Sequence, residues 1–246
     1  ALAALSSEEL RSTRDIVHKD AQFYVISVLI LFIVFALGAT YVPGGTNEAA
    51  ILTPTLAAIP LVTYGIYVFL HQQDASEHVA DETHSVRPGR EWGMLGVGLV
   101  IITVGVEGMV QGALALGVIF DTPTFLWGLT VIAAGTSLPD AFVSVRAAKN
   151  DDSVTSLTNV LGSNTFNLLV AIPVGVLLAG RATIDFLVAI PTMGCLGFAT
   201  LVFIVFIRTE LELSDREAYT LLGLYVVFVC WMALESVGLI ETVSGI

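Results

Sequence analysis

The chain has 246 residues, of which 55% are hydrophobic and 13% are charged, and its mean hydropathy is +0.85. This composition excludes an ordinary water-soluble domain, because such domains carry about a quarter charged residues. The formal net charge is −12, and no nucleic-acid partner is expected. We therefore expect an integral membrane protein whose surroundings are a lipid bilayer.

Seven apolar stretches follow one another along the chain. They cover residues 21–42, 49–70, 92–119, 124–146, 154–179, 184–207 and 218–239. Each reaches the roughly 20 residues that a helix needs to cross a hydrocarbon core of about 30 Å. Their hydrophobicity is continuous, whereas barrel strands would alternate at every second residue. The sequence thus predicts an all-α membrane protein with seven transmembrane helices.

The ten Lys and Arg residues predict the orientation of these helices. With seven crossings, one side of the membrane receives Arg11, Arg14, Lys19, Arg87, Arg90, Arg146, Lys149, Arg208 and Arg216. The other side receives Arg181 alone. By the positive-inside rule the first side is the cytoplasm. We expect a multi-pass protein of the cell membrane with its N-terminus in the cytoplasm and its C-terminus outside.

One long polar linker divides the chain. Residues 1–70 hold two predicted helices, residues 71–91 form a cytoplasmic linker, and residues 92–246 hold five predicted helices. The linker is acidic, and its simplest interpretation is a solvated loop. A regulatory cation site is the alternative, and its ligands would be His78, Asp81, Glu82 and His84.

The most informative motif is Gly-Thr-Ser-Leu-Pro-Asp at residues 135–140, near the centre of the fourth stretch. A carboxylate at this depth costs about 2.5–3.5 kcal/mol on insertion scales, so it usually faces an ion pathway or a partner. Pro139 has no N–H, and backbone oxygens near Gly135 and Thr136 should lose their helical donors. Carbonyl, hydroxyl and carboxylate oxygens are the ligands that replace water around Na⁺ or Ca²⁺.

Two polar stripes extend this motif. Thr136, Asp140 and Ser144 recur every four residues, with Ser137 beside them. The next stretch repeats the spacing with Thr155, Asn159, Ser163 and Asn167, with Asn164 beside them. Hydrogen bonds that hold two helices together explain many such residues taken singly. They do not explain a carboxylate beside a proline at mid-membrane depth, so we interpret the stripes as an ion site.

These residues resemble a known motif. The segment from Gly135 to Asp140, with Ser144, then Asn159 to Asn164 and Phe166-Asn167, resembles the second alpha-repeat of the sodium/calcium exchanger family in the cation/calcium antiporter superfamily. The resemblance implies a fold of ten helices in two inverted five-helix repeats with the ion site between them. This chain is similar to helices 4 to 10 of that fold.

The resemblance also implies metal ligands. Asp140 stands at the position of the central acid, and Thr136 and Ser137 stand at the positions of hydroxyl and backbone ligands. Thr155 and Asn159 match ligands of the following helix, and Ser163 completes the set. The chain departs from the family's pattern in having Asp where many members have Glu, and in having Thr158 where Gly is usual.

Residues 1–91 contain no second Gly-Thr-Ser-x-Pro-Glu/Asp motif. Asp140 alone offers one negative charge to an ion that carries two, and the family normally supplies a second acid from the other repeat. We therefore expect an N-terminally truncated exchanger whose partner is the missing first alpha-repeat. A transport-inactive fragment remains an alternative.

The expected function is secondary antiport of Ca²⁺ against Na⁺ by alternating access, with no cofactor beyond the transported ions. The alternative is Ca²⁺/H⁺ exchange with Asp140 and Glu107 as proton carriers, and K⁺ is a further possible coupling ion. Glu107, with Gln111 one turn on, could instead be a protonated acid bonded to a neighbouring helix. An intramembrane aspartyl protease needs two facing aspartates, and Asp140 stands alone at mid-membrane depth. We expect no enzyme.

Overall fold

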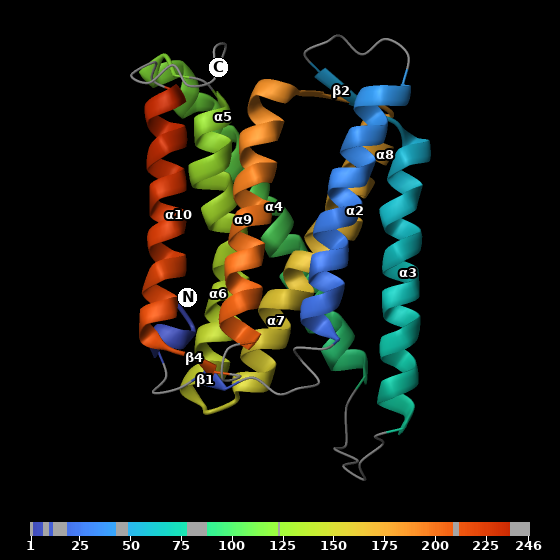
Figure 1. The fold of residues 1–246 in the computed structure, drawn as a ribbon, viewed down its shortest axis with the longest axis vertical. Helices are drawn as coiled ribbons and strands as arrows, with labels where there is room; N and C mark the ends of the chain where they lie inside the picture. The colour runs from blue at the N-terminus through green and yellow to red at the C-terminus, as the bar shows by residue number, and fades with distance from the viewer. Residues whose placement is uncertain are drawn as a thin grey trace.

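The computed structural model of the chain describes residues 2–6, 10–11, 19–42, 49–77, 88–122, 124–208 and 212–236. In these ranges the protein is a bundle of long helices that run along one common direction (Figure 1). The helices are α2 (Asp20–Tyr41), α3 (Pro54–Glu77), α4 (Pro88–Phe120), α5 (Thr124–Trp127), α6 (Ala133–Lys149), α7 (Ser153–Phe166), α8 (Ile172–Ala179), α9 (Phe186–Arg208) and α10 (Asp215–Ser236). A short 3-10 helix, η1 (Ala4–Ser6), lies beside α6 and α10.

The seven predicted helices are confirmed, and two of them are composite. The π-helical turn η2 (Gly128–Ile132) joins α5 to α6, and the π-helical turn η3 (Asn167–Ala171) joins α7 to α8. Within the described ranges, six helices are long and apolar enough to cross a membrane. The composite helix from Thr124 to Lys149 is not among the six, and it carries the polar motif.

The sequence did not predict two short β-pairings. Strand β1 (Leu10–Arg11) pairs antiparallel with β4 (Glu212–Leu213), and β2 (Ala49–Leu52) pairs antiparallel with β3 (Ala182–Asp185). The stretches expected to be helical from residues 49 and 184 therefore begin their helices later, at Pro54 and Phe186. Pro54 suits a first helical position, because its missing N–H has no helical acceptor there.

The pairings connect the same two helices at both ends of the molecule. β1 precedes α2 and β4 follows α9, whereas β2 follows α2 and β3 precedes α9. Between the ends, the Thr200 hydroxyl donates to the Tyr24 hydroxyl at 3.1 Å, and the rings of Phe35 and Phe186 meet edge to face at 5.7 Å. We refer to the antiparallel helices α2 and α9 with their two strand pairings as the α2–α9 frame.

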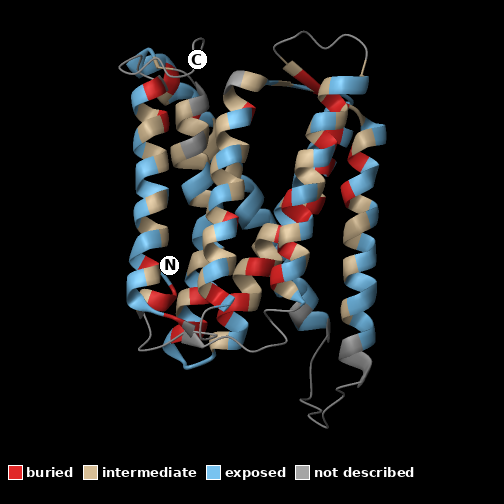
Figure 2. Ribbon diagram, in the orientation of Figure 1, coloured by how far each residue is buried: buried red, intermediate tan, exposed pale blue. Residues whose placement is uncertain are grey.

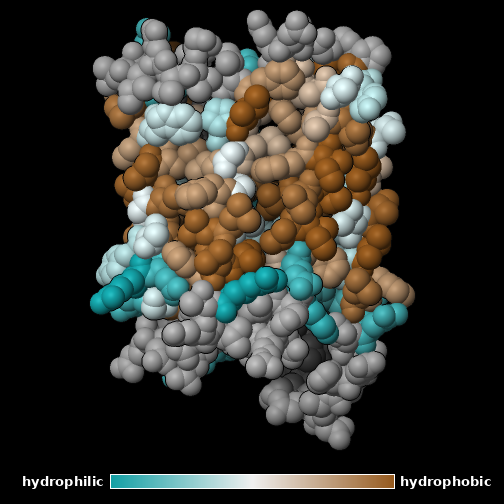
Figure 3. Space-filling view, viewed as in Figure 1, coloured by the Kyte–Doolittle hydropathy of each residue, from teal (hydrophilic) through white to brown (hydrophobic). Residues whose placement is uncertain are grey.

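Buried residues gather along α2, α7 and the end of the bundle where β1 and β4 pair (Figure 2). The larger core cluster there includes Tyr24, Leu157, Leu161 and Ile207. Much of the outer surface is apolar, and Figure 3 shows a hydrophobic belt around the middle of the face in view. In water this surface would be costly, so the belt fits contact with acyl chains.

The Lys and Arg residues of the described ranges are distributed as expected for helices that cross the membrane in alternating directions. Lys19, Arg90, Lys149, Arg208 and Arg216 stand at helix ends on the side where β1 and β4 pair. Arg181 lies between α8 and β3 at the opposite end. Which end faces the cytoplasm stays a prediction. The possible linker site at His78, Asp81, Glu82 and His84 lies outside the described residues, as do Arg14 and Arg87.

Candidate ion site

The motif at residues 135–140 lies in the first half of α6, directly after the π-helical turn η2. Helix α6 continues through Pro139 without a break. A proline can stand inside a membrane helix where side chains and neighbouring helices satisfy the backbone. Pro139 leaves the carbonyl of Gly135, four residues back, without its helical donor. The Thr136 hydroxyl does not replace that donor, because it donates to the carbonyl oxygens of Ile132 at 2.9 Å and Ala133 at 3.2 Å.

Gly135 allows α4 to approach this part of α6. A Cβ atom placed on Gly135 would collide with the side chain of Met109, which belongs to α4. The side chain of Met109 is flexible, but its present position requires a residue without a Cβ atom. The glycine of the motif therefore leaves room for a side chain from α4 at the start of α6.

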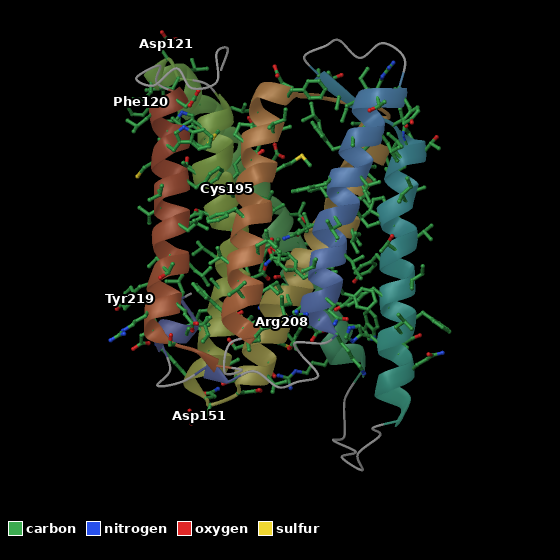
Figure 4. All side chains as sticks on the ribbon, viewed as in Figure 1. Phe120, Asp121, Asp151, Cys195, Arg208 and Tyr219 are labelled. Carbon is green, nitrogen blue, oxygen red and sulfur yellow. The ribbon has the colours of Figure 1, made fainter. Side chains whose placement is uncertain are left out.

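The turn between α6 and α7 lies at the end of the molecule marked by Asp151 in Figure 4. Asp152 caps α7, and its carboxylate accepts from the Thr155 N–H at 3.0 Å. Hydrogen bonding with the Thr155 side chain, and then with its N–H, lowers the pKa of Asp152 below its usual value. Thr155 thus lies in the first turn of α7, exposed and next to the helix cap.

Asn159 connects the two polar stripes. Its side-chain Nδ2 donates to the main-chain oxygen of Asp140 at 3.1 Å and to Ser144 Oγ at 2.9 Å. Ser144 is buried at 2% exposure, so this bond lies inside the α6–α7 interface. The amide nitrogen is therefore occupied, and Oδ1 is the atom of Asn159 left to receive an ion.

Two cavities flank the interface between α6 and α7. The first, of about 430 Å³, is bordered by α6, α7, α10 and the segment before η1. The second, of about 560 Å³, is bordered by Asp140 of α6 and by residues of α7 and η3. Asp140, Ser163 and Asn167 line both cavities. These three side chains consequently form the partition between the two spaces.

The remaining predicted ligands divide into two groups. Ser137 lines the first cavity and Asn159 lines the second, so the structure brings both close to Asp140. Neither Thr136 nor Thr155 lines either cavity. Asn167 was visible in the sequence as the end of the second stripe but was not named as a ligand. Its place after Asn159 and Ser163 at intervals of four was the signal that could have identified it.

The cavities are lined by oxygen-bearing side chains that suit hard cations. Carboxylate, hydroxyl and amide groups contribute, and no Lys, Arg or His side chain lines either space. Across the described part of the chain, no group of three or more His, Cys, Asp and Glu residues could hold a metal ion. Asp140 is thus the single formal charge at the partition, and a divalent ion there would need another acid for full compensation.

Glu107 lies apart from this partition. It is exposed on α4, and its Oε1 accepts from Gln111 Nε2 on the same helix at 2.9 Å. Its apolar neighbours include Val104, which is 68% exposed. The bond to Gln111 is made within one helix, unlike the bond between helices that the sequence suggested as an alternative.

The family model and the named relatives that are similar to this chain indicate one protein family. A family model described as sodium/calcium exchanger protein matches residues 90–234. An uncharacterized membrane protein of Methanocaldococcus jannaschii is 29% identical over 167 residues, which are 65% of this chain and 51% of that protein. The sodium/calcium exchanger MaX1 of Methanosarcina acetivorans is 28% identical over 127 residues, which are 52% of this chain and 36% of that protein. The chain thus spans about half or less of the length of these relatives.

Solved structures share the fold. The sodium-calcium exchanger NCX_Mj superposes with a TM-score of 0.63 at 20% identity, and the superposition covers 93% of this chain and 71% of the NCX_Mj chain. A crystal structure of the H⁺/Ca²⁺ exchanger CAX superposes with a TM-score of 0.63 at 16% identity, and the superposition covers 94% of this chain and 59% of the CAX chain. The fold is therefore that of membrane cation exchangers. With its family model matched over more than half of its residues, the chain belongs to the sodium/calcium exchanger family.

Proposed function

We propose that this chain contributes the second half of a secondary antiporter that exchanges Ca²⁺ for Na⁺ by alternating access. The observation that carries the proposal is the partition itself, where Asp140, Ser163 and Asn167 each face two separate cavities. An ion held at such a partition can be reached from one space or from the other. Alternating access requires a site of this kind to exchange ions with both sides of the membrane in turn.

The proposed ligands follow from what each side chain has left to offer. Asp140 supplies the charge, and Ser137, Ser163 and Asn167 supply neutral oxygens. Asn159 contributes Oδ1, because its nitrogen is held by α6. Thr136 and Thr155 remain candidate ligands, but the Thr136 hydroxyl already serves the backbone and Thr155 lies at the helix cap. We expect substitutions at these two threonines to have the smallest effects.

We further propose that a complementary segment supplies the second acid. Removing a divalent ion from water costs many kcal/mol, and a single carboxylate does not compensate for it. We therefore expect the 246-residue chain alone to show no Ca²⁺ exchange in proteoliposomes. Co-expression with a three-helix segment that carries Gly-Thr-Ser-x-Pro-Glu should restore it. Exchange by the purified chain alone would contradict this part of the proposal.

The central test is Asp140→Asn in the complemented protein. The substitution removes the charge and keeps the volume, so Na⁺-driven Ca²⁺ uptake should fall by about 100-fold or more, which corresponds to ~3 kcal/mol of lost ion binding. The matched control is Asp151→Asn. Asp151 lies in the turn after α6 with φ +59°, a conformation that Asn tolerates well. Near-normal uptake by Asp140→Asn would remove this residue from the site.

The second candidate is Ca²⁺/H⁺ exchange, which the structural similarity to CAX favours. In that case Asp140 would release a proton when Ca²⁺ binds. Two gradients separate the candidates in the same vesicles. Uptake driven by a Na⁺ gradient at equal pH on both sides supports Na⁺ coupling. Uptake driven by a pH gradient without Na⁺ supports H⁺ coupling.

A further inference from the structure

A groove between α2 and α9 opens at the edge of the apolar belt. It has a volume of about 400 Å³ and lies at the end of the molecule where β1 and β4 pair. Val25 and Ile26 of α2 and Leu201 and Ile204 of α9 form apolar walls. Seven residues separate Leu201 from Arg208, so the groove extends about 10 Å along α9 at 1.5 Å per residue.

The polar residues of the groove lie at its mouth. Gln22 is in the first turn of α2, and Arg208 is the last residue of α9. Figure 4 shows Arg208 at this lower end of the helices, and Figure 3 shows hydrophilic side chains along the same edge of the belt. A cation at the polar edge of an apolar groove is the arrangement that an anionic amphiphile complements.

No carboxylate in the described ranges forms an ion pair with Arg208. On α2, the acid nearest in sequence to the groove residue Gln22 is Asp20. Its Oδ1 lies 3.2 Å from His71 Nε2 on α3. Asp20 and Gln22 are two residues apart, so their side chains leave a helix in widely different directions. The carboxylate of Asp20 is therefore engaged on the α3 side of α2. The positive charge of Arg208 remains available at the mouth.

The groove has fixed walls, because both belong to the α2–α9 frame. Close packing continues beside it, where a Cβ atom on Gly197 of α9 would approach the Phe32 ring of α2 at 3.3 Å. The groove's volume of about 400 Å³ is also too small for a helix of the same length, whose diameter with side chains is about 10–12 Å. An acyl chain is narrower, and the belt already faces acyl chains.

We propose that this groove binds one phospholipid with an anionic headgroup. The phosphate accepts hydrogen bonds from the Arg208 guanidinium and the Gln22 amide, and one acyl chain lies along the walls formed by α2 and α9. The site is separate from the cavities around Asp140, and its occupation does not depend on which ion is transported.

The test uses the purified full chain in detergent and native mass spectrometry. Phosphatidylglycerol and phosphatidylcholine with identical acyl chains are titrated separately. We expect one phosphatidylglycerol to be retained about fivefold more tightly than phosphatidylcholine, the preference given by one Arg near a membrane surface. Arg208→Gln should remove this preference. Arg216→Gln is the matched control, because Arg216 lies in the first turn of α10 at the same end of the molecule and does not line the groove.

A second variant tests the walls. Leu201 is 65% exposed, so Leu201→Trp fills the groove from its rim without disturbing the core, and it should weaken retention of the lipid. Leu178→Trp, at an 85% exposed position on α8, should leave retention unchanged. Equal retention of both lipids, equal effects of Arg208→Gln and Arg216→Gln, or displacement of the lipid by free glycerol phosphate would overturn the proposal.

Discussion

Asn159 has a structural role, and in the proposed function it also has a role in ion binding. Its nitrogen holds the Asp140 carbonyl and the Ser144 hydroxyl, and its oxygen is left at the second cavity. The two bonds fix the part of α6 that follows Pro139, where the backbone has lost one donor. Asn159 therefore positions Asp140 as well as offering an oxygen of its own.

We expect Asn159→Ala to weaken Ca²⁺ binding less than Asp140→Asn does. The substitution deletes a neutral oxygen and two hydrogen bonds with a net value of about 1 kcal/mol each, so the half-saturating Ca²⁺ concentration should rise about thirtyfold at most. The measurement is the Ca²⁺ dependence of uptake by the complemented protein. Asn150→Ala, in the exposed turn after α6, is the control. A loss greater than that of Asp140→Asn would reverse the two assignments.

At the residue scale, the sequence predicted which polar residues share a helix face better than it predicted their hydrogen bonds. Spacing by four correctly placed Asp140 and Ser163 along one interface, because helix periodicity determines which residues share a face. It could not reveal that the Thr136 hydroxyl turns back to Ile132, nor that the Asn159 nitrogen crosses to α6. Those choices depend on rotamers and on the distance between the helices, which a single sequence does not encode locally.

At the scale of elements, the strand pairings are features that a hydropathy profile could not predict. Residues 49–52 and 182–185 are as apolar as helix ends, and they pair across the sequence as β2 and β3. A helix and a short buried strand cannot be distinguished by hydrophobicity alone. The backbone of β2 lies close to α2, where Gly38 faces the carbonyl oxygen of Ile51.

Gly38→Ala should destabilise this junction. A Cβ atom there would lie 2.7 Å from Ile51 O, a backbone atom that cannot turn away. Overpacking of this kind costs about 1–3 kcal/mol, and the thermal unfolding midpoint should fall accordingly. Gly65→Ala on α3 is the control, because nothing lies within 4 Å of its added Cβ and alanine favours the helix. Equal midpoints for the two variants would show that β2 can move away from α2.

For the whole molecule, the number of helices and their alternation could be predicted because each helix must cross about 30 Å of hydrocarbon. The packing between helices could not, since apolar residues face lipid and protein alike. Helix α4 illustrates this, because its span from Trp92 to Phe120 is among the most hydrophobic and yet Ala113 and Gly117 are the only buried residues of that span. Hydropathy identified the span but said nothing of its neighbours.

The predicted orientation can be measured at the two ends of the bundle. Figure 4 places Asp121 and Asp151 at opposite ends, and both residues are exposed. In a protein with Cys195 and Cys230 replaced by Ala, Asp151→Cys should react with an impermeant reagent from the cytoplasm. Asp121→Cys should react from outside. Labelling of both from one side would be incompatible with seven crossings, and exchanged sides would invert the predicted orientation.

The α2–α9 frame has a consequence for any experiment on motion. Strand pairings at both ends and the Tyr24–Thr200 bond between them leave these two helices little freedom to shift against each other. We therefore expect the two helices to move as one body. Spectroscopic probes on these two helices should report a constant distance between them, so the pair can serve as a fixed reference within the molecule. A distance from this reference to α4 or α6 would then measure the displacement of that helix alone.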